Sequence, residues 1–170
     1  MPSSYCARKP MVEVTDRAAV ILSVRSGPRS GYRCVMAMED EHRLSLRRAA
    51  EIMRRELARG DLAFAFRVMT QAFADFRDTS PENREDFLMP PESTGSTKWD
   101  TLLAAVAGRE CDRLGMTRPP WTTPEPLEEE WVVTTLPAPS ARWLARIRAG
   151  TPEEFSRLGL WVHALDLETL

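Results

Sequence analysis

Two apolar stripes at helical spacing, separated by only a few residues, constrain the fold of this 170-residue chain most strongly. The first stripe has residues at i, i+3, i+4, i+7 and i+11, and the second repeats a similar spacing after Gly60. The stripes consist of Leu46, Ala49, Ala50, Met53 and Leu57, and of Leu62, Ala65, Phe66, Met69, Phe73 and Phe76. Such spacing places apolar residues on one face of a helix. The short connection therefore predicts an antiparallel helix hairpin.

Helix start and stop signals frame these stripes and recur later in the chain. Ser45 and Asp61 stand where N-cap residues belong, and Gly60 stands where a C′ residue belongs. Thr97 and Asp100 have the spacing of a capping box, ahead of a third stripe that ends at Gly115. Further start signals stand at Ser140 and at Thr151-Pro152. We therefore predict a mainly α fold, a compact bundle of about four to six helices built on the N-terminal hairpin.

The segments outside these helices are predicted to be loops or extended chain. Residues 78–97 are rich in turn-forming residues, and residues 116–139 are rich in proline, which excludes a helix. Trp121 and Trp131 within the second segment predict a loop that packs on the domain. Residues 160–164 are extended or form a short strand, so we expect at most one or two short strands.

The N-terminal part differs in charge from the rest of the chain. Residues 1–37 carry six basic and two acidic residues, a net charge of +4, which leaves −6 for residues 38–170. Two interpretations stay open. The segment is either an extension that a mis-assigned start adds to a single helical domain of residues 38–170, or an edge hairpin built on the apolar run at 18–24.

The net charge, the cysteines and the apolar runs indicate which partners and which compartment to expect. The whole chain has a net charge of −2, which gives no reason to expect a nucleic-acid or anionic-membrane partner. Cys6, Cys34 and Cys111 are odd in number and far apart, which favours free thiols in a reducing cytoplasm over a disulfide framework. The apolar run at 18–24 is too short to span a bilayer. We expect a cytoplasmic protein.

No spacing in the sequence matches a known kind of catalytic or metal site. The histidines are His42 and His163, and no cysteine has a near neighbour, so metal ligands do not come in the close pairs that such sites use. A Cys111–His163 nucleophile pair can be drawn, yet Cys111 lies beside the apolar stripe of its helix, where a buried structural thiol is commoner. Residues 94–98 resemble a phosphate loop only superficially, since the order of Gly, Lys and Ser/Thr is wrong. We expect no enzyme, no metal and no cofactor.

Two features favour protein binding. The second helix carries Phe64 and Val68 opposite its core stripe, so it is either central in the domain or offers one face to a partner. Near the C-terminus, Trp161 stands in an exposed-looking stretch beside an apolar tail, and tryptophan is common at interface hot spots. The candidate partner-binding residues are Phe64, Val68, Trp161, His163 and Leu170.

An alternative function rests on the first helix. Arg48, Arg55 and Arg59 project from it opposite the apolar stripe, as on a helix that faces DNA phosphates. An ordinary solvated face has the same pattern, and Glu51 and Glu56 interrupt the positive charge. A DNA-binding transcriptional regulator is therefore the alternative prediction.

Five segments together carry a family resemblance. They are 58–68 (Ala-Arg-Gly-Asp-Leu-Ala-Phe-Ala-Phe-Arg-Val), 99–105, 119–121 (Pro-Pro-Trp), 151–162 (Thr-Pro-Glu-Glu-Phe-Ser-Arg-Leu-Gly-Leu-Trp-Val) and 166–168. In this order they resemble a group of uncharacterised actinobacterial helical proteins, some of them similar to the C-terminal part of antitoxins paired with nucleotidyltransferase-like toxins. The resemblance implies a non-catalytic module that binds and restrains a toxin enzyme, and it assigns no contact residue.

Overall fold

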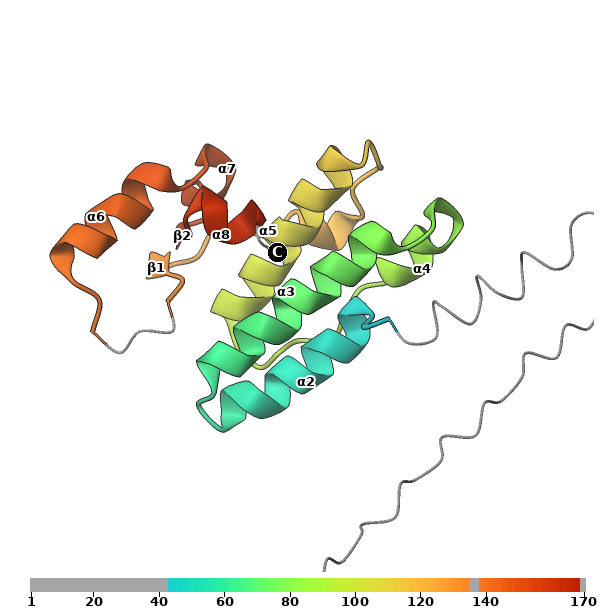
Figure 1. Ribbon diagram of the computed structural model, residues 1–170, viewed down its shortest axis with the longest axis horizontal. Helices are drawn as coiled ribbons and strands as arrows, with labels where there is room; N and C mark the ends of the chain where they lie inside the picture. Colours follow the sequence, from blue (N-terminus) through green and yellow to red (C-terminus); the bar gives the residue numbers. More distant parts are fainter. Residues whose placement is uncertain (1–42, 135–137, 169–170) are drawn as a thin grey trace, which may run out of the picture.

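The computed structural model describes residues 43–134 and 138–168 of the chain (Figure 1). The basic segment 1–37 and Leu170 therefore lie outside the described residues, and both interpretations of that segment stay predictions.

Helices α2 (Leu46–Ala58) and α3 (Leu62–Asp78) form the predicted antiparallel hairpin. The Ser45 hydroxyl accepts a hydrogen bond from the Arg48 N–H at 3.3 Å, and the Asp61 carboxylate accepts one from the Phe64 N–H at 2.9 Å. Gly60 has φ +80°, a left-handed conformation that glycine adopts without strain. Both predicted caps and the predicted stop are confirmed.

Helix α3 lies in the middle of the molecule, between α2 and α5 (Thr97–Arg113) (Figure 1). Its buried residues form one arc that spans about 140° of the helix circumference at roughly 100° per residue. They are Ala65, Val68, Met69, Ala72, Phe73 and Phe76. This arc is wide because α2 and α5 both pack against α3.

A short helical segment and a loop join α3 to α5. The helical segment consists of the 3₁₀ turn η1 (Pro81–Asn83) and the one-turn helix α4 (Arg84–Phe87). The centre of the Phe87 ring lies 5.3 Å from that of Phe76 on α3. Helix α5 starts at Thr97 with Ser96 as its N-cap, so the capping box predicted from Thr97 is wrong by one residue. The Asp100 carboxylate instead accepts hydrogen bonds from the Thr94 N–H and hydroxyl, both at 2.7 Å. Through these two hydrogen bonds Asp100 holds the loop before α5 against the first turn of the helix.

The C-terminal part is built from short elements. In order they are η2 (Pro120–Thr122), β1 (Trp131–Val132), α6 (Ala141–Gly150), α7 (Glu153–Ser156), β2 (Leu160–Trp161) and α8 (Ala164–Glu168). Strands β1 and β2 pair in parallel, with Trp131 opposite Leu160. The Trp131 ring lies 5.4 Å from that of Trp99, which connects this part to α5.

The structure confirms the predicted mainly α fold on a helix hairpin. The one-turn helices α4, α7 and α8 raise the number of helices in the described residues above the predicted four to six. No helix within residues 43–134 and 138–168 is both long and apolar enough to cross a membrane.

Candidate partner-binding surface

Phe64 is the large aromatic side chain that α3 leaves at the surface. It is 39% exposed, and the guanidinium of Arg67 lies 5.4 Å from the centre of its ring. Leu62 is 40% exposed, but two residues turn a helix by about 200°, so Leu62 and Phe64 point to opposite sides of α3. The exposed apolar surface at this place therefore consists of the Phe64 ring rather than of a Leu62–Phe64 patch.

Val68 has to be withdrawn from the predicted partner-binding residues. Its side chain is only 7% exposed and belongs to the core. Val68 lies at the edge of the buried arc of α3, which is the central helix, so the open choice made from the sequence is decided for this residue.

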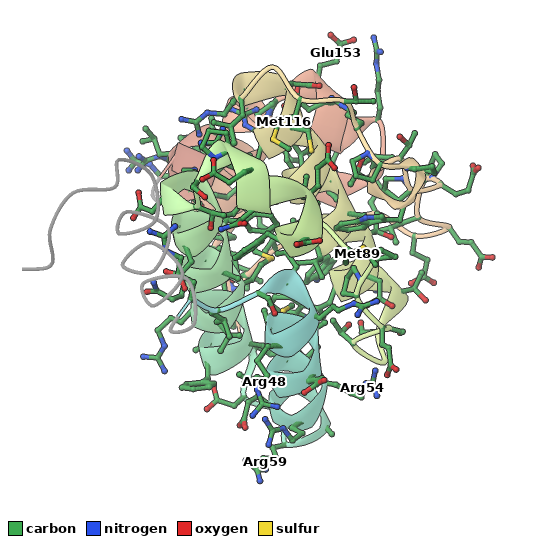
Figure 2. The ribbon with its side chains drawn as sticks, turned by 90° about the vertical axis from the view of Figure 1, so that its right-hand side faces the viewer. Arg48, Arg54, Arg59, Met89, Met116 and Glu153 are labelled. Atoms are coloured by element: carbon green, nitrogen blue, oxygen red, sulfur yellow. The ribbon has the colours of Figure 1, made fainter. Side chains whose placement is uncertain are left out.

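The arginines predicted to face DNA phosphates lie on the exposed side of α2. Arg48 pairs with Glu51 at 2.7 Å and Arg59 pairs with Glu56 at 2.9 Å. Arg55 is exposed and has no ion pair within the part of the chain that the structure describes. Figure 2 shows Arg48 and Arg59 at the surface around α2, with Arg59 at the end of the helix. Two of the three guanidinium charges are thus opposed by a carboxylate of the same helix.

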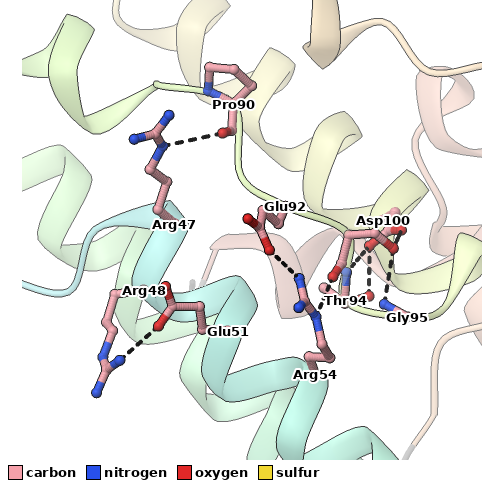
Figure 3. Close-up of polar contacts among 10 residues, drawn as sticks. Arg47, Arg48, Glu51, Arg54, Pro90, Glu92, Thr94, Gly95 and Asp100 are labelled. Carbon is pink, nitrogen blue, oxygen red and sulfur yellow. Dashed lines mark hydrogen bonds and ion pairs between the residues drawn. The ribbon is translucent and has the colours of Figure 1, made fainter.

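Two further arginines of α2 hold a neighbouring loop. Arg54 donates through Nε to the Ser93 carbonyl at 2.8 Å and pairs through Nη2 with Glu92 at 2.9 Å. Arg47 donates through Nε to the Pro90 carbonyl at 3.4 Å (Figure 3). These guanidiniums fix the loop before α5 along one flank of α2.

Trp161 is predicted from the sequence to be exposed, but its side chain makes several contacts within the protein. Its Nε1 donates a hydrogen bond to the Glu130 carboxylate at 3.1 Å, and the Arg148 guanidinium lies 5.4 Å from its ring. Arg148 also approaches Glu130 at 3.6 Å. The half-buried ring therefore joins β2, α6 and Glu130, the residue before β1.

His163 is half-buried and packs against the end of α6. A Cβ placed on Gly150 would lie 2.4 Å from its ring, so the absence of a side chain at Gly150 makes room for the imidazole. The Nδ1 atom of His163 accepts a hydrogen bond from the Leu165 N–H at 3.2 Å. This contact implies a structural role for His163.

Cys111, the thiol considered as a nucleophile, is fully buried on α5. Burial raises the pKa of this thiol, with a smaller contribution from the nearby Asp112 carboxylate. A thiol with a raised pKa stays protonated at neutral pH, which is the unreactive form. The part of the chain that the structure describes also brings no three histidine, cysteine or acidic residues together as metal ligands.

Sequence reasoning missed the most buried charged residue. Glu110 is 1% exposed on α5 and binds Arg77 of α3 through two contacts, at 2.8 and 2.9 Å. A signal was present, since Glu110 follows Val106 by four residues and therefore stands on the apolar stripe of α5.

Comparison with protein-family models, with curated proteins and with solved structures finds no match for this chain. No relative therefore supplies a function or a site residue, and the resemblance to antitoxins stays a prediction.

Proposed function

We propose that this chain is a non-catalytic protein-binding module whose contact surface centres on Phe64, on the outer side of the α2–α3 hairpin. The observation that carries the proposal is the 39% exposure of Phe64 on a helix whose other aromatic residues are partly buried (Phe66) or fully buried (Phe73 and Phe76). Aromatic side chains that a protein leaves at its surface are common anchors in protein interfaces, because they bury a large area at a small entropic cost.

The charges around Phe64 support the proposal. Arg67 stacks on the ring, and Arg55 and Arg59 lie near the end of the neighbouring helix. Arginine and aromatic residues are the types enriched in the centres of interfaces. Arg67 also keeps its guanidinium and the ring in one place, which lowers the entropy lost on binding.

DNA binding is the second candidate, supported by the exposed Arg55 and by the high exposure of Arg48 and Arg59, 60% and 70% of their side chains. The ion pairs with Glu51 and Glu56 speak for the first candidate, because a phosphate would have to compete with them.

The resemblance described above makes the proposal more specific. The partner would be a toxin of the nucleotidyltransferase class, which this chain would bind and restrain, and both proteins would act in the cytoplasm. The buried, protonated Cys111 fits a reducing compartment, where unpaired thiols persist.

Co-expression with the product of the adjacent gene tests the proposal. We expect a stable complex that the Phe64→Asp variant loses, because the apolar contact of the ring is removed and a charged carboxylate would have to be desolvated in its place. Ala145→Asp, which adds the same charge at an exposed position on α6, is the matched control and should keep the complex.

Fluorescence anisotropy with a labelled DNA duplex tests the alternative. DNA binding that weakens steeply with salt and is lost in Arg48→Gln/Arg55→Gln/Arg59→Gln would favour the regulator. The protein-binding proposal expects weak binding that these substitutions hardly change.

A further inference from the structure

A groove runs along the N-terminal half of α5, beside the loop at residues 91–93 that Arg54 holds. It has two neighbouring lobes, of about 290 and 470 Å³, which meet at Thr101 of α5 and Pro124 of the following loop, since these residues line both lobes. The smaller lobe extends to Trp121 and to the loop of residues 91–93, and the larger one extends to Leu127. We call the two neighbouring lobes together the α5 groove.

The walls of the α5 groove are built to keep their shape. Pro91, Pro124 and Pro126 have a restricted backbone, which limits how far the loops can move. Trp121 is fixed because its Nε1 donates to the Leu88 carbonyl at 2.9 Å. Arg54 holds the wall of residues 91–93 through Ser93 and Glu92 (Figure 3). A groove that already has its bound shape costs little entropy to fill.

The rim of the larger lobe carries an excess of negative charge. Lys98 pairs with Glu129 at 3.8 Å. Glu125 and Glu128 are exposed, and neither has an ion pair or a side-chain hydrogen bond within residues 43–134 and 138–168. Two carboxylates therefore face this end of the groove without a cation of the protein.

The length of the α5 groove limits what it can hold. From Thr97 to Ala104, α5 rises by about 10 Å, at roughly 1.5 Å per residue. An extended peptide advances about 3.3 Å per residue, so roughly three to four residues cover this length.

We infer that the α5 groove binds a short, extended segment of a partner protein, with apolar residues against Trp121 and Pro124 and a lysine or arginine beside Glu125 and Glu128. The inference is independent of the proposed function, because the groove is lined by α5 and the loops at 91–93 and 121–129, none of which includes Phe64, and the charges at the two places are of opposite sign.

Peptide binding to the full chain tests the inference. The probe is a fluorescein-labelled heptapeptide, Gly-Leu-Pro-Leu-Lys-Arg-Gly, and its control has Glu-Glu in place of Lys-Arg. We expect a saturable rise in anisotropy with the basic peptide and none with the acidic one. Glu125→Gln/Glu128→Gln should weaken binding about fivefold, as expected for two solvent-exposed charge contacts.

Two further variants distinguish peptide binding in the groove from non-specific attraction between the basic peptide and the acidic protein surface. Glu82→Gln/Glu85→Gln removes the same charge at η1 and α4 and should leave the affinity unchanged. Thr97→Trp should block binding by filling the larger lobe, with an unchanged far-ultraviolet circular dichroism spectrum. If Thr97→Trp fails to fold, the inference is tested by comparing the peptide affinity of Glu125→Gln/Glu128→Gln with that of Glu82→Gln/Glu85→Gln.

Several results would overturn the inference. One is equal binding of the two peptides, or binding of neither. Another is a concentration-dependent dimer that Glu125→Gln/Glu128→Gln abolishes, because a second copy of the chain would then occupy the groove. Tighter peptide binding by Arg25→Gln/Arg29→Gln would instead identify the chain's own basic segment as the occupant.

Discussion

Arg77 of α3 and Glu110 of α5 form a two-contact ion pair in which Glu110 is 1% exposed and the Arg77 side chain 22%. The hydrogen bond to Glu110 raises the pKa of Arg77, so the guanidinium stays charged. Arg113 approaches the same carboxylate at 3.3 Å. This pair joins the central helix, which carries Phe64, to α5, which forms the wall of the groove.

Glu110→Gln should destabilise the fold by about 2 kcal/mol, because Arg77 would be left beside a neutral amide. Breaking a fully buried pair costs about 3–5 kcal/mol, and the partial exposure of Arg77 lets water replace some of the interaction. Urea unfolding at neutral pH measures the effect as a lower midpoint with an unchanged m value. Arg113→Ala, at an exposed contact, should cost less than about 1 kcal/mol, and equal losses for the two variants would contradict a dominant Arg77–Glu110 pair.

Gly150→Ala should destabilise the protein by about 1 kcal/mol, because the new methyl group would displace the His163 ring. In a His163→Ala background the same change should be neutral or stabilising, since alanine favours the helix over glycine by about 0.5–1 kcal/mol. A double-mutant cycle from thermal unfolding gives the coupling between the two residues. No coupling would mean that the ring does not pack against the end of α6.

The pKa of Asp112 should lie below the usual aspartate range, chiefly because Arg118 donates hydrogen bonds to its carboxylate. A carboxyl whose pKa is lower in the folded state stabilises the fold at pH above the unfolded pKa, and this stabilisation is lost as the pH falls through the folded value. The pair is exposed, so its contribution to stability is small. A carbon-13 NMR titration should show the pKa of Asp112 returning to the usual range in Arg118→Gln, and an identical titration in both proteins would contradict the contact.

Cys111 should be unreactive toward a thiol reagent in the folded protein. Burial raises its pKa, so the reactive thiolate is depleted as well as inaccessible. A Cys6→Ser/Cys34→Ser protein leaves Cys111 as the single thiol, and its labelling in native buffer should be far slower than in urea. Labelling in native buffer at the rate of an unfolded thiol would show that this part of α5 is accessible.

Local patterns were sufficient to predict the helices and most of their ends. Ser45, Asp61 and Ser140 cap helices as predicted because a cap depends on a hydrogen bond to a residue three positions away. The same locality explains why the hairpin was predictable from Gly60 and the spacing of two stripes.

Features that depend on distant packing could not be predicted in this way. Strand β2 falls within the stretch at 160–164 that was predicted to be extended or a short strand, but its pairing with β1 across the whole of α6 and α7 could not be predicted from so short a segment. The burial of Val68 depends on α3 being the central helix. The role of Arg54 depends on the path of the loop at residues 90–93. The sequence therefore predicted the exposure of Phe64 and of the arginines on α2, but it did not predict the α5 groove.

The affinity of the Phe64→Asp variant for the protein partner tests the central claim most directly. Isothermal titration calorimetry of the purified partner with wild type, Phe64→Asp and Ala145→Asp would measure it, with urea unfolding to confirm that all three are folded. We expect Phe64→Asp to weaken binding at least about 30-fold, the loss of a hot-spot residue, and Ala145→Asp to bind like wild type. A folded Phe64→Asp protein that binds the partner with wild-type affinity would contradict the claim.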